Sequence, residues 1–113
     1  MVIDILTIFP ELVTRALSES LLGRAISEGI LEVNVHDLRS FTDDKHQVVD
    51  DAPFGGGPGM VMKVEPIHRG VRSCIESHPE KSHSVIVTSA SGKRFDQAYA
   101  EDLSRREHLI FVC

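Results

Sequence analysis

The stretch Val2-Ile3-Asp4-Ile5-Leu6-Thr7-Ile8 opens the chain and points to its fold class. Most of these residues are apolar and β-branched, which is typical of a strand buried inside a sheet. Apolar residues then recur from Phe9 to Leu17 at the spacing of one helix face. Pro10 stands where a first-turn proline belongs, because its missing N–H would have no partner there. The chain therefore begins with a buried strand that passes directly into a helix.

The same two patterns alternate along the rest of the chain. In order, they predict a strand over 2–8, helices over 9–17 and 21–26, a strand over 31–35, a helix over 64–75, a strand over 85–88, a helix after Asp96 and a strand over 109–113. Gly29 is a predicted helix stop, and Asp96 a predicted helix cap. Strands joined through helices predict an α/β fold, with a mainly parallel sheet and helices on both faces.

The composition narrows the class of protein. With 113 residues, 42% hydrophobic and 26% charged, the chain has the size and balance of one globular domain rather than of a disordered, collagen-like or coiled-coil protein. No apolar run reaches the ~20 residues of a membrane span, and the first residues do not resemble a secretory leader. Two cysteines, Cys74 and Cys113, cannot form a disulfide framework. We therefore expect a cytoplasmic protein with no membrane partner.

The charge balance bears on possible partners. The net charge is −5, from 12 basic and 17 acidic residues, so the chain as a whole does not favour nucleic acid. An acidic protein can nevertheless hold RNA on a local basic patch, so RNA remains an open partner.

The segment from Asp37 to Met62 shows no periodicity and predicts a long loop, which in a compact domain is commonly functional or disordered. It contains Gly55-Gly56-Gly57-Pro58-Gly59. This string is neither a P-loop nor the dinucleotide fingerprint, because it lacks their spacing and follows no predicted strand. Glycines are tolerated at such density where the backbone approaches a ligand or adopts positive φ. From the glycines alone, a ligand loop and a flexible loop tip are equally open.

Charged side chains surround these glycines. The loop carries Asp43, Asp44, Asp50, Asp51 and His46. Their spacing matches neither a calcium loop nor a zinc site, so no metal is predicted. A carboxylate here is able to read a base edge by accepting from an amino group or ring N–H. Arg24, Lys45, His46 and Lys63 are candidates to offset the acidic charge, and scattered surface charge is the alternative.

A second candidate site follows the strand over 85–88. In parallel α/β sheets, ligands bind outside the carboxyl ends of the strands. The turn Ser89–Lys93 would offer amides and hydroxyls there at a helix N-terminus, and an ordinary connecting turn is the alternative. Its letters match no serine-nucleophile motif. The histidines without paired spacing are predicted to be surface or capping residues: His36, His68, His78, His83 and His108. Cys74 is a predicted core residue, and Met60 and Met62 are predicted to pack under the glycine loop.

Several motifs together resemble one known family. They are Ile8-Phe9-Pro10-Glu11, Gly23-Arg24-Ala25, Val49-Asp50-Asp51-Ala52-Pro53-Phe54-Gly55-Gly56-Gly57-Pro58-Gly59-Met60, Asp96-Gln97-Ala98 and Leu109–Cys113. In this order, over the whole 113 residues, they resemble the bacterial tRNA (guanine-N1)-methyltransferases. The long string around the glycines is the most specific of them.

The resemblance implies a fold and an activity. Members of the family are homodimeric SPOUT methyltransferases with a trefoil-knotted α/β domain and a smaller C-terminal helical domain. They transfer a methyl group from S-adenosylmethionine to N1 of the guanosine just 3′ of the tRNA anticodon. Cofactor and base meet at the dimer interface.

The resemblance also implies site residues. The residues on the guanosine side would be Asp50, Gly55, Gly56, Gly57 and Gly59, with Arg24, Lys45 and His46 as basic neighbours. One wall of the cofactor pocket would be formed by Val87, Thr88, Ser89 and Ala90. The family usually has leucine and proline where this chain has Thr88 and Ala90, a departure that affects the rigidity and apolar packing of that wall.

The resemblance places the chemistry beyond residue 113. The knot, most of the cofactor loop, the aspartate base and the assisting arginine of the family would follow Cys113. We therefore expect residues 1–113 to form an incomplete SPOUT domain with no catalytic residue of its own, and the chain to be the front part of a longer polypeptide. The alternatives are a non-catalytic module for dimerisation or RNA binding, and a different α/β nucleotide-binding enzyme that shares only the sheet.

Overall fold

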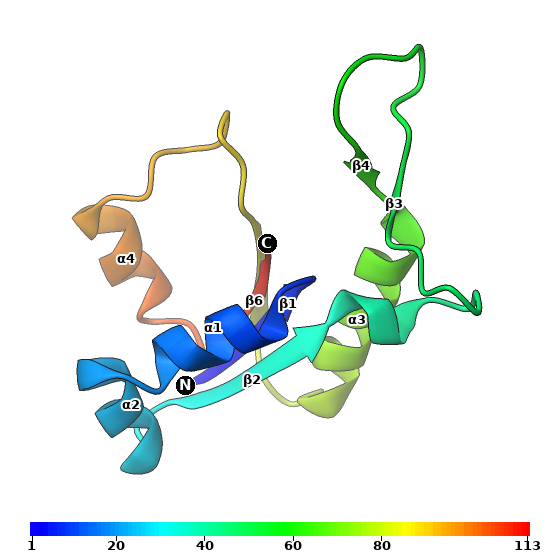
Figure 1. Cartoon of the computed structure of the whole chain (residues 1–113). Coiled ribbons are helices and arrows are strands. Elements are labelled where there is room, and N and C mark those ends of the chain that lie inside the picture. The colour runs from blue at the N-terminus through cyan, green and yellow to red at the C-terminus, as the bar shows by residue number, and fades with distance from the viewer.

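The computed structural model describes residues 1–113 and is built on a parallel sheet with helices on both faces (Figure 1). The elements in chain order are β1 (Val2–Thr7), α1 (Pro10–Leu17), α2 (Ser20–Ser27), β2 (Glu32–Asp37), the 3₁₀ helix η1 (Leu38–Phe41), β3 (Asp50–Asp51), β4 (Val61–Met62), α3 (Val64–Ser77), β5 (His83–Val87), α4 (Gln97–Leu103) and β6 (His108–Val112). The predicted order of strands and helices is confirmed. No helix combines the length and the apolar character needed to cross a membrane.

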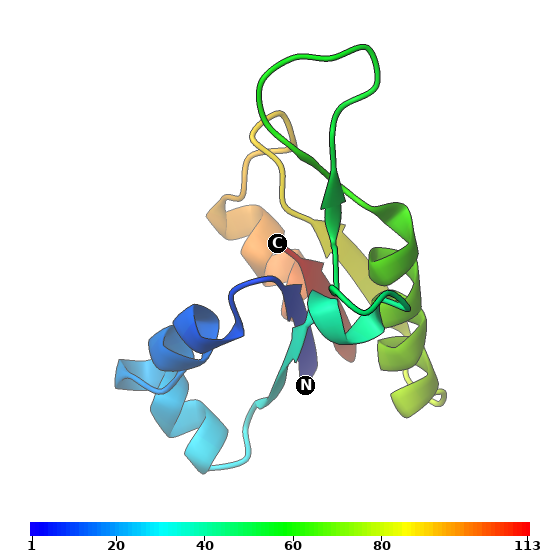
Figure 2. The same cartoon turned by 45° about the vertical axis from the view of Figure 1, so that its right-hand side comes forward.

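The order of the strands determines which helices share a face. The main sheet runs β2-β1-β6-β5, and all its neighbouring strands are parallel. The steps β1→β2 and β5→β6 cross the sheet in one direction, and β2→β5 crosses it in the other. Because such crossovers are right-handed, α1, α2 and α4 lie on one face and α3 on the opposite face. Figures 1 and 2 show this division.

The face covered by α3 holds the apolar core. Leu6 of β1 and Ile110 of β6 are fully buried there, and Cys74 of α3 packs in the same cluster, as predicted. Gly70 explains how closely α3 approaches, because a Cβ at this position would lie 2.8 Å from a Leu6 methyl carbon. Because Gly70 has only a hydrogen atom in place of a side chain, α3 can pack this closely against the sheet.

The opposite face is covered more loosely. Helices α1 and α2 contain no buried residue. Ile3, Ile5 and Phe111 of the sheet instead line an open apolar pocket of about 320 Å³ together with side chains of these helices.

Local signals at the helix ends act as the sequence predicts. Pro10 occupies the first turn of α1. Gly29 has a φ of +71° after α2, and Ile30 N–H donates to the Ala25 carbonyl at 2.9 Å, which closes the helix in a Schellman arrangement. Asp96 caps α4 by accepting from Tyr99 N–H at 2.9 Å.

The segment 37–62 is more ordered than its sequence predicts. It contains η1 and an antiparallel hairpin, in which Asp50 pairs with Met62 and Asp51 with Val61. Met62 packs against the core as predicted, whereas Met60 is exposed, so its predicted packing role is wrong. Most of the segment is loop as predicted, but the β3–β4 pairing within it was missed, because strands of two residues are too short to show alternation. The hairpin extends beyond the sheet (Figure 2).

Candidate functional site

Two connections extend beyond the carboxyl edge of the parallel sheet. One is the β3–β4 hairpin, and the other is the turn that follows β5 (Figure 2). The sheet is held together up to this edge, because Cys113 N–H donates to the Leu6 carbonyl and Thr88 N–H donates to the Val112 carbonyl, each at 3.0 Å. Since ligands of parallel sheets bind outside the carboxyl ends of the strands, this edge is the candidate site.

The tip of the hairpin has a backbone that favours glycine. The φ values are +85° at Gly55, +77° at Gly56, +122° at Gly57 and +92° at Gly59. A Cβ at any of these positions would meet nothing within 4 Å. The glycines therefore serve backbone conformation rather than close packing within the chain. They also leave an exposed strip of backbone with no side chains to obstruct a ligand.

A pocket lies along the base of the hairpin. Its volume is about 700 Å³, and residues 51–54 and 61–65 line it. Phe54 is fully exposed beside it, although large aromatic rings are usually buried. Asp50, in the adjacent strand, is half-buried. The hairpin thus combines a carboxylate, an exposed aromatic ring and bare backbone.

The structure separates the three basic residues predicted for this site. Lys45 and His46 are exposed in the loop that leads to β3, where the Asp44 carboxylate accepts from the backbone N–H of His46 at 3.1 Å. Arg24 lies on α2 and pairs with Glu28 at 2.7 Å. Helix α2 is at the opposite end of the molecule from the hairpin in both views (Figures 1 and 2). Within this chain, Lys45 and His46 can act with the hairpin, but Arg24 cannot.

The acidic residues of the segment do not converge on one point. The Asp43 carboxylate pairs with the guanidinium of Arg69 on α3, and the hydrogen bond from Arg69 lowers the pKa of Asp43. Asp51 accepts from the N–H of Ala52 at 2.8 Å. These carboxylates organise the loop and its attachment to α3.

The turn after β5 provides the other half of the candidate site. Thr88 lines the apolar pocket beside Phe111 and Cys113, and its hydroxyl donates to the Val112 carbonyl at 3.2 Å. The neighbouring residues Val87, Ser89 and Ala90 are exposed. The turn is closed by Gly92 N–H, which donates to the Ser89 carbonyl at 3.2 Å.

One expectation about this turn is wrong. Helix α4 begins only at Gln97, with Asp96 as its cap, so the turn does not lie at a helix N-terminus. Ligand contacts at the turn would therefore use its own backbone and side chains, without the dipole of α4.

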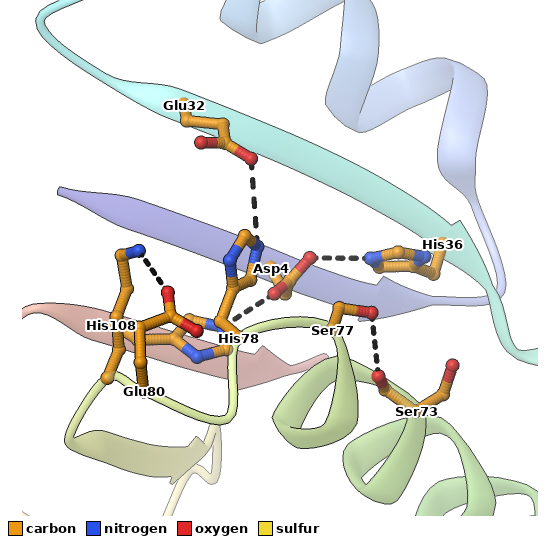
Figure 3. Close-up of polar contacts among 9 residues, drawn as sticks. Asp4, Glu32, His36, Ser73, Ser77, His78, Glu80 and His108 are labelled. Carbon is orange, nitrogen blue, oxygen red and sulfur yellow. Dashed lines mark hydrogen bonds and ion pairs between the residues drawn. The ribbon is translucent and has the colours of Figure 1, made fainter.

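A buried polar cluster was not predicted from the sequence. Asp4 of β1 is 2% exposed, and its two carboxylate oxygens lie 2.6 Å from Nε2 of His36 and 2.6 Å from Nε2 of His108 (Figure 3). His108 is fully buried, so its predicted surface or capping role is wrong. The strand pattern recognised at Leu109 begins one residue earlier, which places His108 inside the sheet. His78, which directly follows α3, packs edge-on against His108, with ring centroids 5.2 Å apart.

Comparison with known proteins identifies the family. The family model of the tRNA (Guanine-1)-methyltransferase TrmD matches residues 1–113. The chain belongs to the TrmD family. It is 43% identical over 111 residues to the tRNA (guanine-N(1)-)-methyltransferase of Enterococcus faecalis, covering 98% of this chain and 45% of that protein. It is 50% identical over 111 residues to that of Dictyoglomus turgidum, covering 98% of this chain and 44% of that protein.

A solved TrmD-family structure matches the fold. The crystal structure of tRNA (m1G37) methyltransferase from Aquifex aeolicus superposes with a TM-score of 0.88 at 33% identity, over 100% of this chain and 50% of that one. The sequence-based assignments of family and α/β fold class are thereby confirmed. The chain spans less than half the length of these two curated relatives.

Proposed function

We propose that the whole protein transfers a methyl group from S-adenosylmethionine to N1 of the guanosine that follows a tRNA anticodon on its 3′ side. The proposal rests on one observation. Segment 49–60, which carries the family resemblance, forms an exposed hairpin with a glycine tip at the carboxyl edge of the sheet, and this hairpin includes Asp50. Family membership supplies the class of reaction. The hairpin supplies a surface suited to a nucleobase.

The guanosine side of the proposal rests on the chemistry of the hairpin. Guanine carries N–H donors at N1 and at its exocyclic amino group, and a carboxylate such as that of Asp50 accepts from such groups. An enzyme that reacts at N1 must first remove the base from its stack. The glycine tip allows backbone to approach an extruded base closely, and the exposed ring of Phe54 offers a stacking surface. Lys45 and His46 would meet the tRNA backbone nearby.

The cofactor side of the proposal uses the turn after β5. We assign Val87, Thr88, Ser89 and Ala90 to one wall of the S-adenosylmethionine pocket. Thr88 already lines an apolar pocket with Phe111, which suits the uncharged carbon groups of the cofactor. The exposed turn at 89–90 offers backbone groups for its polar parts.

The reaction indicates which chemical group the rest of the whole protein would have to provide. The N1 lone pair forms a bond to the methyl carbon, the carbon–sulfur bond breaks, and S-adenosylhomocysteine leaves. The proton on N1 must pass to a base within hydrogen-bond reach. We assign that base to residues beyond this chain, with 1–113 as part of a SPOUT domain. Homodimerisation, which rests on the family resemblance, belongs to the same proposal, and so does a cytoplasmic location, which the small number of cysteines favours.

The direct test is the product. The whole protein, S-adenosylmethionine and a tRNA transcript with guanosine 3′ of the anticodon should yield 1-methylguanosine, measured by mass spectrometry after nuclease digestion. A matched transcript with adenosine at that position should yield none. Retention of tRNA without any 1-methylguanosine would overturn the proposal and favour a non-catalytic RNA-binding module.

A further inference from the structure

The buried polar cluster on the α3 side of the sheet contains residue types that bind metal ions. One oxygen of Asp4, Nε2 or Nδ1 of His36 and Sγ of Cys74 all lie within 4.8 Å of one another. They come from β1, β2 and α3, on the face opposite to α1 and α2. We propose that Asp4, His36 and Cys74 bind a divalent transition-metal ion of the zinc class, which joins these three elements. The inference is independent of the proposed methyl transfer, because it uses none of the hairpin or turn residues.

The geometry requires only small movements. Zinc bonds are about 2.0–2.3 Å long, so the ligand atoms of a tetrahedral site lie roughly 3.3–3.7 Å apart. The Asp4 oxygen and His36 Nε2 are now 2.6 Å apart, at hydrogen-bond distance. An ion between them would replace the shared proton and separate them slightly. The side chain of His36 is 32% exposed, which gives the ion a path from solvent and gives water access to a fourth position.

The charges balance when a divalent ion is bound. Metal ions bind thiolate, carboxylate and neutral imidazole, so binding would release the thiol proton of Cys74 to solvent. One carboxylate and one thiolate then neutralise the two positive charges. A neutral assembly is what a buried site tolerates.

A second layer of contacts already orients the carboxylate. Nε2 of His108 lies 2.6 Å from Oδ2 of Asp4, which leaves Oδ1 toward His36 (Figure 3). Such hydrogen bonds to a ligating carboxylate fix its direction and tune its basicity. His108 of β6 is paired with Val2 of β1 and His83 of β5, and its ring packs against the ring of His78. The three-ligand site therefore has a rigid support on the side away from solvent.

The ligand types select the ion. Thiolate and imidazole favour zinc, cobalt and related ions, whereas magnesium and calcium prefer oxygen ligands in larger number. The proposal thus commits to zinc chemistry and predicts no response to magnesium at this site.

Cobalt(II) provides the spectroscopic test, because it occupies zinc sites and is coloured. Titration of the purified, chelator-treated protein should produce visible d–d bands and a near-ultraviolet thiolate-to-cobalt charge-transfer band, saturating at one ion per chain and abolished by zinc but not by magnesium. Cys113→Ser is the matched control, since Cys113 is the other cysteine and is exposed. It should keep both bands, and Cys74→Ala should lose the charge-transfer band.

A second measurement covers variants that fail to fold. Zinc should raise the melting temperature of the wild-type chain and of Cys113→Ser, and should not raise that of His36→Asn. Absence of the charge-transfer band in the wild-type protein at excess cobalt would overturn the proposal. So would a band lost in Cys113→Ser and kept in Cys74→Ala.

Discussion

The glycines of α3 and of the β3–β4 hairpin serve opposite purposes. A Cβ at Gly70 would lie 2.8 Å from Leu6 in the fully buried core, whereas a Cβ at Gly56 would meet nothing within 4 Å. Gly70 is needed for packing, and Gly56 for a left-handed backbone that leaves its surroundings empty. The comparison teaches that this chain keeps its stability in the sheet–α3 core, and its candidate binding surface at the glycine tip of a hairpin whose base packs against that core through Met62.

The largest expected effect is on the core side of the comparison. Leu6→Ala should lower the free energy of unfolding by about 2–5 kcal/mol, because a fully buried leucine leaves a cavity between β1 and α3. Urea unfolding followed by circular dichroism measures this. Leu12→Ala on the exposed face of α1 is the control and should change stability by about 0.5 kcal/mol or less. Equal losses of unfolding free energy in Leu6→Ala and Leu12→Ala would contradict the assignment of stability to the sheet–α3 core.

The second prediction compares the two glycines directly. Gly70→Ala should cost about 1–3 kcal/mol of unfolding free energy, because the added methyl group overpacks the core against Leu6. Gly56→Ala should cost about 1–2 kcal/mol at most, because a Cβ at positive φ strains the backbone of this one exposed residue and displaces no core side chain. The same urea experiment ranks them. A larger loss for Gly56→Ala would show that the hairpin is part of the cooperative core.

The smallest predicted effect concerns acid. Glu107, next to β6, accepts from the Ser82 hydroxyl at 2.6 Å and from its N–H at 2.9 Å, and these hydrogen bonds lower the pKa of Glu107. A carboxyl whose pKa is lowered by folding stabilises the chain above its unfolded pKa, and this contribution is lost as the pH falls through the lowered value. Wild type should therefore exceed Ser82→Ala in stability at neutral pH, and the two should converge in acid.

One result of the same pH series would contradict this prediction. A difference between wild type and Ser82→Ala that stays constant down to strongly acidic pH would mean that the ionised carboxylate of Glu107 is not its source.

Much of the fold could be predicted because its signals are local. The apolar run at Val2–Thr7, the stop at Gly29 and the cap at Asp96 act within a few residues, and all three are confirmed. The β3–β4 pairing could not be predicted, since it joins Asp50 to Met62 across the glycines through only two residues on each side. The burial of His108 was missed because it depends on Asp4, at the other end of the chain.

The candidate site divides in the same way. The segment 49–60 could be recognised because its amino-acid sequence is distinctive. The residues that lie next to it in space could not be predicted from the sequence. Arg24 belongs to a family-like motif but is part of α2, a helix at the far end of the molecule from the hairpin. Cys74 was predicted to be in the core, and that is correct, but its approach to Asp4 and His36 requires three elements to come together. Sequence patterns fix what a residue does within its own element, and tertiary packing decides its partners.

The central claim is that the hairpin carries function and the core carries stability. It is tested most directly by Asp50→Ala in the whole protein, with three quantities measured on one preparation: formation of 1-methylguanosine, affinity for S-adenosylmethionine and the free energy of unfolding. The account predicts that methylation is lost, while cofactor affinity and unfolding free energy stay close to those of the wild type. Unchanged methylation, or a loss of all three together, would contradict it.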